Sequence, residues 1–230
     1  MKYRSILVGA ALAIATTSSA NAATIVLNFE GVGSQASIKG FYNGGTDSKG
    51  NSGTNYGVDF TTFGFGLIDA DDGGTGNIAN VPSGNTVLTF GNSISPIMNY
   101  AAGFTTGFSF FYSSSKPAVT VSVYDGLNGT GNLLGSLNLV SQYKGDSCVG
   151  DPTGAFCNWT AMGMSFNGVA KSIHFGNGAI QTMFDDVTLG SATPGSAVPE
   201  PATWAMMIIG FGAVGSMVRT SRRRNAFSAA

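Results

Sequence analysis

Acidic side chains are the first residues in this sequence whose types and spacing could support chemistry. Asp69, Asp71 and Asp72 cluster in LIDADDGGTGN, and Asp185 and Asp186 are adjacent in MFDDVTLG. Two carboxyl groups about 5 to 9.5 Å apart can hydrolyse a glycosidic bond, whereas calcium takes about six to eight oxygens from carboxylates, carbonyls and water. Aspartate beside glycine is also typical of a turn. We therefore assign no catalytic residue here and favour calcium, although the first cluster lacks the D-x-D-x-D-G order of an EF-hand loop.

Asp185 and Asp186 raise a separate question because they are neighbours in the chain. Successive residues of a strand point to opposite faces, so one of the two carboxylates must face the interior if this stretch is a strand. A buried carboxylate needs a metal ion or hydrogen-bond donors. The sequence leaves both solutions open, since loop amides would satisfy the group as well as calcium would.

His174 is the only histidine, and it lies in KSIHFGN between Ile173 and Phe175. Alternation places its imidazole on the face opposite these two apolar residues. A serine–histidine–aspartate site needs a nucleophile held beside the ring, and no G-x-S-x-G turn occurs in the sequence. We therefore expect His174 to be an exposed or edge residue without a catalytic role.

Cys148 and Cys157 are the only cysteines, and they share one loop, CVGDPTGAFC. Two thiolates without a nearby histidine are a poor zinc set, so we expect a disulfide. A pair this close oxidises if the chain is exported, which is what its two ends, described below, indicate. Trp159 follows two residues later and is the only tryptophan outside the C-terminal tail. It is our candidate for stacking on a sugar, with core packing or shielding of the disulfide as the alternative.

The charges of residues 23–197 limit the possible partners. This region carries five lysines and no arginine against eleven carboxylates. A nucleic-acid binder needs a basic stripe, so we exclude nucleic acid as a partner. Sparse charge combined with many Gly, Asn, Ser, Thr and Phe residues is typical of an extracellular all-β domain.

Short runs in which apolar and polar residues alternate are the main structural signal, and this period is typical of half-buried strands. The apolar positions that share a face are Ile25, Leu27 and Phe29; Phe104, Phe108, Phe110 and Tyr112; Val119, Val121 and Val123; Leu137 and Leu139; Met162, Met164 and Phe166; and Ile173 and Phe175. MFDDVTLG is the last such run, and residues 38–85 are less regular, with a long surface loop. We expect an all-β fold, an antiparallel jelly-roll-like β-sandwich at residues 23–190, flanked by an N-terminal signal peptide and a single C-terminal transmembrane helix.

The N-terminal end has the three parts of a secretion signal. Lys2 and Arg4 precede an apolar stretch, and an A-x-A site ends at Ala22, just before Ala23. We expect residues 1–22 to be a signal peptide that enters the secretion translocon and is removed by signal peptidase.

The C-terminal end has the composition of a membrane span. Residues 202–218 contain no charge, and as a helix they would reach roughly 25 Å, close to the ~30 Å of a hydrocarbon layer. We expect a transmembrane helix there, with a basic cytoplasmic end at 219–224 and a flexible stalk at 191–198. A buried core helix is the alternative, but such a helix would need no arginines at its exit.

The order of residues in this tail is specific: it consists of Pro199-Glu200-Pro201, Trp204, Gly210-Phe211-Gly212 and Arg222-Arg223-Arg224. This order resembles the PEP-CTERM sorting signal, which at residues 199–224 implies a Gram-negative bacterium that makes exopolysaccharide. The resemblance also implies an exosortase, a membrane cysteine protease that cleaves near the prolines and releases or transfers the passenger. The same kind of tail is sometimes called an ice-binding-protein C-terminal domain, although a sorting tag does not imply ice binding.

Two short motifs of the passenger, NFEG and FDDVTLG, resemble extracellular carbohydrate-binding sandwiches of the galactose-binding type. In such sandwiches an acid near the first strand and an acid in the last strand commonly meet at a structural calcium. The resemblance therefore implies Glu30 and Asp185 or Asp186 as calcium ligands, and calcium as the one candidate cofactor.

Together these features predict an exported protein that passes through the inner membrane as an intermediate and is then delivered to the cell surface or the extracellular matrix. We expect a non-catalytic module that binds or organises exopolysaccharide. A secreted glycan-cleaving hydrolase with paired carboxylates is one alternative. An adhesin or structural scaffold without a small ligand is the other.

Overall fold

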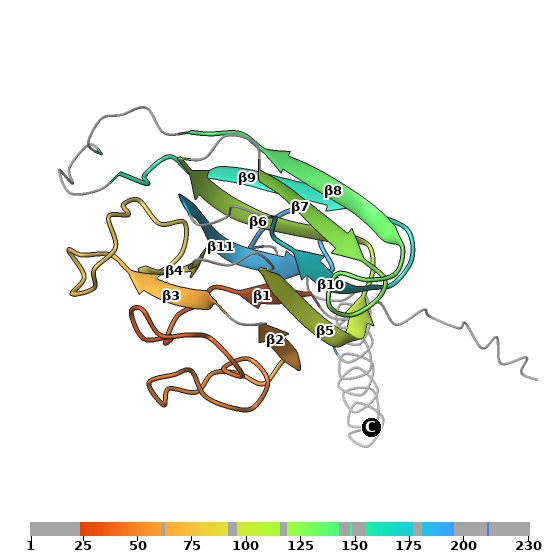
Figure 1. Cartoon of the computed structure of the whole chain (residues 1–230), viewed down its shortest axis with the longest axis horizontal. Coiled ribbons are helices and arrows are strands. Elements are labelled where there is room, and N and C mark those ends of the chain that lie inside the picture. The colour runs from red at the N-terminus through yellow and green to blue at the C-terminus, as the bar shows by residue number, and fades with distance from the viewer. Residues whose placement is uncertain are drawn as a thin grey trace, which may run out of the picture.

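The computed structural model describes residues 24–60, 63–91, 96–115, 119–142, 148, 155–176, 181–195 and 211. The strands within these residues pair antiparallel (Figure 1). Nowhere in these ranges is there a helix of sufficient length and apolar character to cross a membrane. The predicted signal peptide at 1–22 and, apart from Phe211, the predicted span at 202–218 lie outside the described residues.

Two sheets form a sandwich (Figure 1). The first sheet has the order β3 (Gly64–Ile68), β4 (Thr86–Phe90), β11 (Thr182–Leu189), β6 (Gly107–Ser114) and β9 (Thr160–Ser165), with β1 (Ile25–Leu27) also paired to β11. The second sheet has the order β2 (Val58–Phe60), β5 (Ile97–Phe104), β10 (Ala170–His174), β7 (Val119–Tyr124) and β8 (Leu133–Leu139).

The strands from β4 to β11 pass between the sheets in the order of a jelly roll. Neighbours along the first sheet are β4, β11, β6 and β9, and neighbours along the second are β5, β10, β7 and β8. Two interleaved sets of four strands make this architecture. The predicted antiparallel β-sandwich is therefore confirmed in the described part of the chain.

Alternating apolar residues fill the space between the sheets, as the sequence pattern predicts, and the valines of β7 are fully or almost fully buried. One detail of the prediction is wrong. Phe104 ends β5 in the second sheet, whereas Phe108, Phe110 and Tyr112 belong to β6 in the first sheet. A turn separates them, so the four rings reach the common core from opposite sides.

Strand β3 lies in residues 38–85, the region that the sequence left irregular, and β4 begins directly after it. β4 is buried on both faces, because Leu88 packs in the main core and Val87 packs on a smaller cluster outside the first sheet, with Ile78, Phe156 and Met183. A strand that is covered on both sides carries no alternation to detect.

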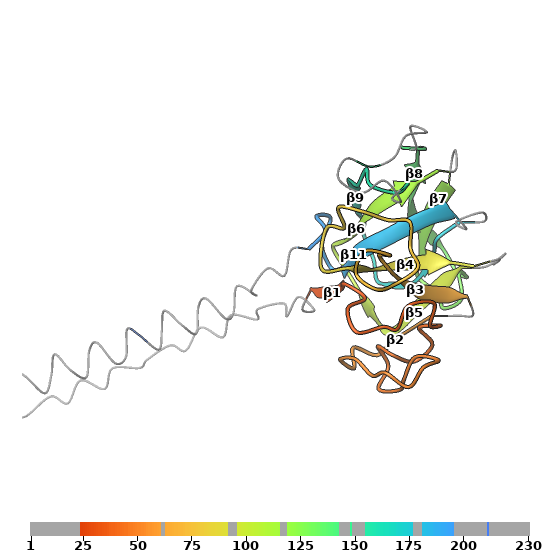
Figure 2. The same ribbon diagram turned by 90° about the vertical axis from the view of Figure 1, so that its left-hand side faces the viewer.

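The segment before β2 forms a lobe beside β2 and β3, seen in red to orange in Figure 1 and Figure 2. Asp47 holds it together, since its buried carboxylate accepts bonds from the N–H groups of Gly33, Lys49 and Asn51 and from the Asn51 amide. Burial acts to raise the pKa of Asp47, but these hydrogen bonds outweigh it and lower the pKa. The predicted long loop is therefore an anchored structure.

The first and last strands of the sandwich are neighbours, since Ile25 of β1 pairs with Leu189 of β11. Beyond β11 the chain folds back on the first sheet. The Ser109 hydroxyl donates to the Ser191 carbonyl at 2.9 Å, and the Gly195 N–H donates to Thr188 Oγ1 at 3.1 Å. The first part of the predicted stalk therefore lies against the sandwich as far as residue 195.

Candidate functional site

Residues 83–86, which we call the carboxylate loop, contact all three predicted calcium ligands. The Ser83 N–H donates to Asp185 Oδ2 at 2.9 Å, and the Ser83 hydroxyl donates to Asp186 Oδ1 at 2.8 Å. One serine thus bridges the two adjacent acids of β11.

Glu30 is held by the other half of the same loop. Its Oε1 accepts the N–H of Asn85 at 3.0 Å and the N–H of Thr86 at 2.9 Å. Gly84 lies between the two contacts with a φ of 57°, and a Cβ there would be 2.2 Å from Glu30 Cδ. Both the backbone angle and the close approach require glycine at this position.

Asp185 and Asp186 are both buried, with 0% and 8% of their surface exposed, although strict alternation would bury only one of them. The pairing of β11 with β6 shifts between Asp185 and Thr188, and Asp186 has a φ of 47°. Such a bulge turns successive side chains away from alternation. Burial, followed by the neighbouring Asp186 carboxylate, raises the pKa of Asp185 to about 7.

These contacts decide what the acid cluster can do chemically. Of the two solutions that the sequence left open, hydrogen bonds from loop amides are present at Glu30 and Asp185. In the described part of the chain, no three His, Cys, Asp or Glu side chains form a group that could hold a metal ion. Calcium binding by Glu30, Asp185 and Asp186 stays a prediction.

The other acids and the histidine have local partners. The N–H groups of Asp72 and Gly74 donate to the Asp69 carbonyl, and the Asp71 N–H donates to Asp69 Oδ1 at 3.2 Å, so this cluster forms a turn. His174 lies half-buried on the outer side of the second sheet, as alternation predicts, and its Nδ1 accepts the N–H of Gly176 at 3.3 Å. Burial lowers the pKa of His174, so its imidazole is neutral at neutral pH.

The predicted disulfide between Cys148 and Cys157 is confirmed, with the two Cα atoms 5.8 Å apart. Trp159 packs on the small outer cluster formed by Ile78, Val87, Phe156 and Met183. Its indole N–H donates to the Ala79 carbonyl at 2.9 Å. The structure therefore shows the packing alternative for Trp159, whose one hydrogen-bond donor is engaged within the protein.

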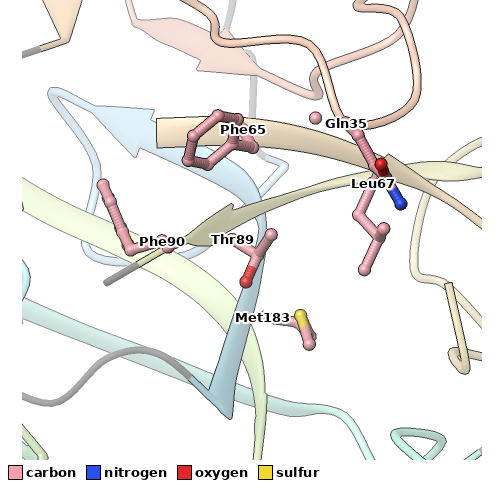
Figure 3. Close-up of a pocket in the computed structure, with 8 residues that line it drawn as sticks. Gln35, Phe65, Leu67, Thr89, Phe90 and Met183 are labelled. Atoms are coloured by element: carbon pink, nitrogen blue, oxygen red, sulfur yellow. The ribbon is translucent and has the colours of Figure 1, made fainter. Parts of the chain in front are cut away.

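A hollow of about 310 Å³ opens on the outer face of the first sheet, over β3 and β4 (Figure 3). Its lining consists of apolar, amide and hydroxyl groups, contributed by Gln35, Phe65, Gly66, Leu67, Thr89, Phe90, Gly91 and Met183. Apolar and aromatic walls with a few polar groups are the usual composition of a small-ligand site.

Three neighbouring strands position the walls of the hollow. Phe65 and Leu67 come from β3, Thr89 from β4 and Met183 from β11 (Figure 3). At its border, Gln35 Nε2 donates to Thr75 Oγ1 at 2.7 Å, which fixes the amide. The sequence does not predict these residues as a site, because no pattern in it marks β3 and β4 as strands. The one feature of the sequence that could have indicated the hollow is Phe65, whose ring is flanked by two glycines and so has no side chain on either adjacent residue.

The tail beyond the sandwich matches a known protein-family motif. The PEP-CTERM protein-sorting motif matches residues 197–224. The tail is a PEP-CTERM sorting signal. A PEP-CTERM tail marks the chain as exported, membrane-anchored through this segment and a partner of an exosortase. Its motif residues, Phe211 excepted, lie outside the described part of the structure. No curated protein matches the chain.

The passenger that precedes this tail is similar to several solved structures. It is similar to the carbohydrate-binding module CBM6cm-2 from Cellvibrio mixtus lichenase 5A in complex with cellotriose, at 11% identity and a TM-score of 0.34 over 56% of this chain and 88% of that chain. It is also similar to a β-1,3-glucan-binding CBM6 from Bacillus halodurans, at 14% identity and a TM-score of 0.34 over 58% of this chain and 94% of that chain. A GH87 α-1,3-glucanase catalytic domain in complex with nigerose matches at 16% identity and a TM-score of 0.39, over 64% of this chain and 28% of that chain. These TM-scores are too low to assign a function to the passenger.

Proposed function

We propose that the passenger is a non-catalytic module that binds exopolysaccharide in the hollow over β3 and β4 after export and exosortase processing. The observation that carries this proposal is the combination of the Phe65 ring, the Gln35 amide and the Thr89 hydroxyl around one opening. An aromatic ring packs on the apolar face of a sugar, while amide and hydroxyl groups exchange hydrogen bonds with its hydroxyls. No lining residue carries a charge, so the hollow suits an uncharged sugar unit.

The burial of the acids supports binding over hydrolysis. A raised pKa near 7 is the property of a general acid, but Asp185 is fully buried and bonded to Ser83. Neither Asp185 nor Glu30 lines the hollow. Glycoside hydrolysis needs two carboxyl groups flanking the scissile bond.

A glycan array tests the binding proposal, using residues 23–197 and including the exopolysaccharide of the source organism. We expect Phe65→Ala to weaken binding at least about tenfold, the effect of losing one aromatic contact. Phe111→Ala is the matched control, because Phe111 is also half-buried on the first sheet but does not line the hollow.

Each outcome of this experiment separates the candidates. Equal losses in the two phenylalanine variants would place the site elsewhere. A parent domain that binds no glycan would favour an adhesin or scaffold. Shortened glycan products would show a hydrolase.

Processing is tested separately. Replacing Pro199, Glu200 and Pro201 by alanine should leave an uncut, membrane-held form in cells that contain the exosortase. Normal cleavage of this variant would contradict the assignment of these residues as the processing signal.

A further inference from the structure

The end of the sandwich where the chain leaves β11 has an unusual surface. We call it the exit end and define it by the turns at 105–106 and 166–169, the start of β8 and residue 190. Thr106 Oγ1 donates to the Gly190 carbonyl at 2.6 Å, and the Phe166 N–H donates to the Thr106 carbonyl at 3.4 Å. A Cβ on Gly168 would lie 3.5 Å from Leu134 Cδ2. The two hydrogen bonds join the turns to residue 190, and the short distance between Gly168 and Leu134 places the turn at 166–169 beside the start of β8.

Apolar side chains project from this surface into solvent. Leu133, the first residue of β8, is 56% exposed, and Val169 is 46% exposed. Beside Val169 lies an open hollow of about 600 Å³, whose lining is Thr105, Thr106, Ser165, Phe166, Asn167, Gly168 and Val169. None of the residues that line this hollow is charged. The charged groups at this end are Asp125, whose carboxylate accepts bonds from Asn132 next to Leu133, and Lys171.

The sorting tail fixes where this surface lies while the tail is attached. Residue 195 is hydrogen-bonded to the sandwich, and the sorting motif starts at residue 197. Six residues separate Gly195 from the predicted span at 202–218. Fully extended, the seven steps from residue 195 to residue 202 reach roughly 25 Å, so Gly195 stays within that distance of the hydrocarbon layer. The exit end lies near Gly195, because Gly195 is bonded to Thr188, two residues before Gly190.

We propose that the exit end rests on the lipid surface before exosortase cleavage, with Leu133 and Val169 entering the interfacial region. Apolar side chains gain free energy in that region, and the short tether raises their effective concentration at the membrane. Cleavage removes the tether, and the few exposed side chains do not hold the passenger on the membrane by themselves. The same surface then leaves the bilayer together with the released passenger.

Tryptophan reporters in the full-length chain test this proposal. The chain is reconstituted into vesicles that contain brominated lipids, which quench tryptophan fluorescence on contact. Leu133→Trp and Val169→Trp place reporters at the exit end. Val140→Trp is the matched control, because Val140 is 65% exposed and follows the opposite end of β8.

We expect the two exit-end reporters to be quenched at least about twofold more than the Val140 reporter, since an indole ring favours the interface. Equal quenching at both ends of β8 would overturn the proposal. A parent chain whose Trp204 is not quenched would also overturn it, because the tail would then not enter the bilayer. Glycan binding plays no part in this measurement, so its result is independent of the function proposed above.

Discussion

The acid cluster and the hollow share two strands, β4 and β11, but the acid cluster is buried and the hollow is open to solvent. Asp185 of β11 is two residues from Met183, which lines the hollow, and Thr86 of β4 is three residues from Thr89. The acids are buried and hydrogen-bonded to one loop, whereas Phe65, half-buried, borders an opening to solvent. The residue types with the most obvious chemistry therefore hold the fold together, and the open site consists of residues that no motif marks.

The pH dependence of stability should show the largest effect of this difference. Asp185 has a pKa of about 7 in the folded state, against about 3.9 in an unfolded chain. Between these values the folded state keeps a proton that the unfolded chain releases, so stability falls as the pH rises. The loss amounts to roughly 4 kcal/mol between about pH 4 and pH 7.

Urea unfolding across this range measures the loss. Asp185→Asn should flatten the curve, because its amide does not titrate. A variant that keeps the full slope would show that another group is responsible.

Added calcium distinguishes the two interpretations of the acid cluster, a calcium site and a cluster held by hydrogen bonds alone. A cation bound by Glu30, Asp185 and Asp186 would keep the acids ionised, so added calcium would raise the melting temperature at neutral pH and a chelator would reverse the effect. A melting curve that responds to neither leaves the hydrogen bonds of the carboxylate loop as the complete account.

Removing the Ser83 hydroxyl should have the next largest effect. Ser83→Ala removes the hydroxyl donor of Asp186 Oδ1, while Asp185 Oδ2 keeps the backbone N–H of residue 83. We expect a loss of about 2 kcal/mol in the free energy of unfolding. Glycan affinity should not change.

Thr89→Ala is the matched variant in the hollow, and it should weaken binding while changing stability by less than about 1 kcal/mol. If Ser83→Ala and Thr89→Ala each changed both the glycan affinity and the free energy of unfolding, the acid cluster and the hollow would not be independent of each other.

The smallest predicted effect concerns Gly91. A Cβ at this position would lie 2.8 Å from Phe65 Cε2, so Gly91→Ala should tilt the ring and weaken glycan binding about threefold. In a Phe65→Ala background the same change should have no further effect, since the ring is absent. A loss of equal size in both backgrounds would refute an effect through Phe65.

Much of the fold could be predicted because its signals are local. The alternation of β7 and β10 and the spacing of Cys148 and Cys157 depend on neighbours in the chain. The contact between Ser83 and Asp185 joins residues that are 102 positions apart, and a turn sequence such as SGN does not indicate which distant residue it will contact. Phe65 was missed for the same reason, since the hollow exists only where β3, β4 and β11 meet.

β11 comes last among the strands yet lies inside the first sheet, between β6 on one side and β4 and β1 on the other. In a chain that crosses a membrane from its amino end, this strand arrives after all the others. Until then β4 and β6 lack the partner that joins them, and the core stays open to solvent. We therefore expect the sandwich to close only after β11 has crossed, which is when the tail at residues 197–224 reaches the bilayer.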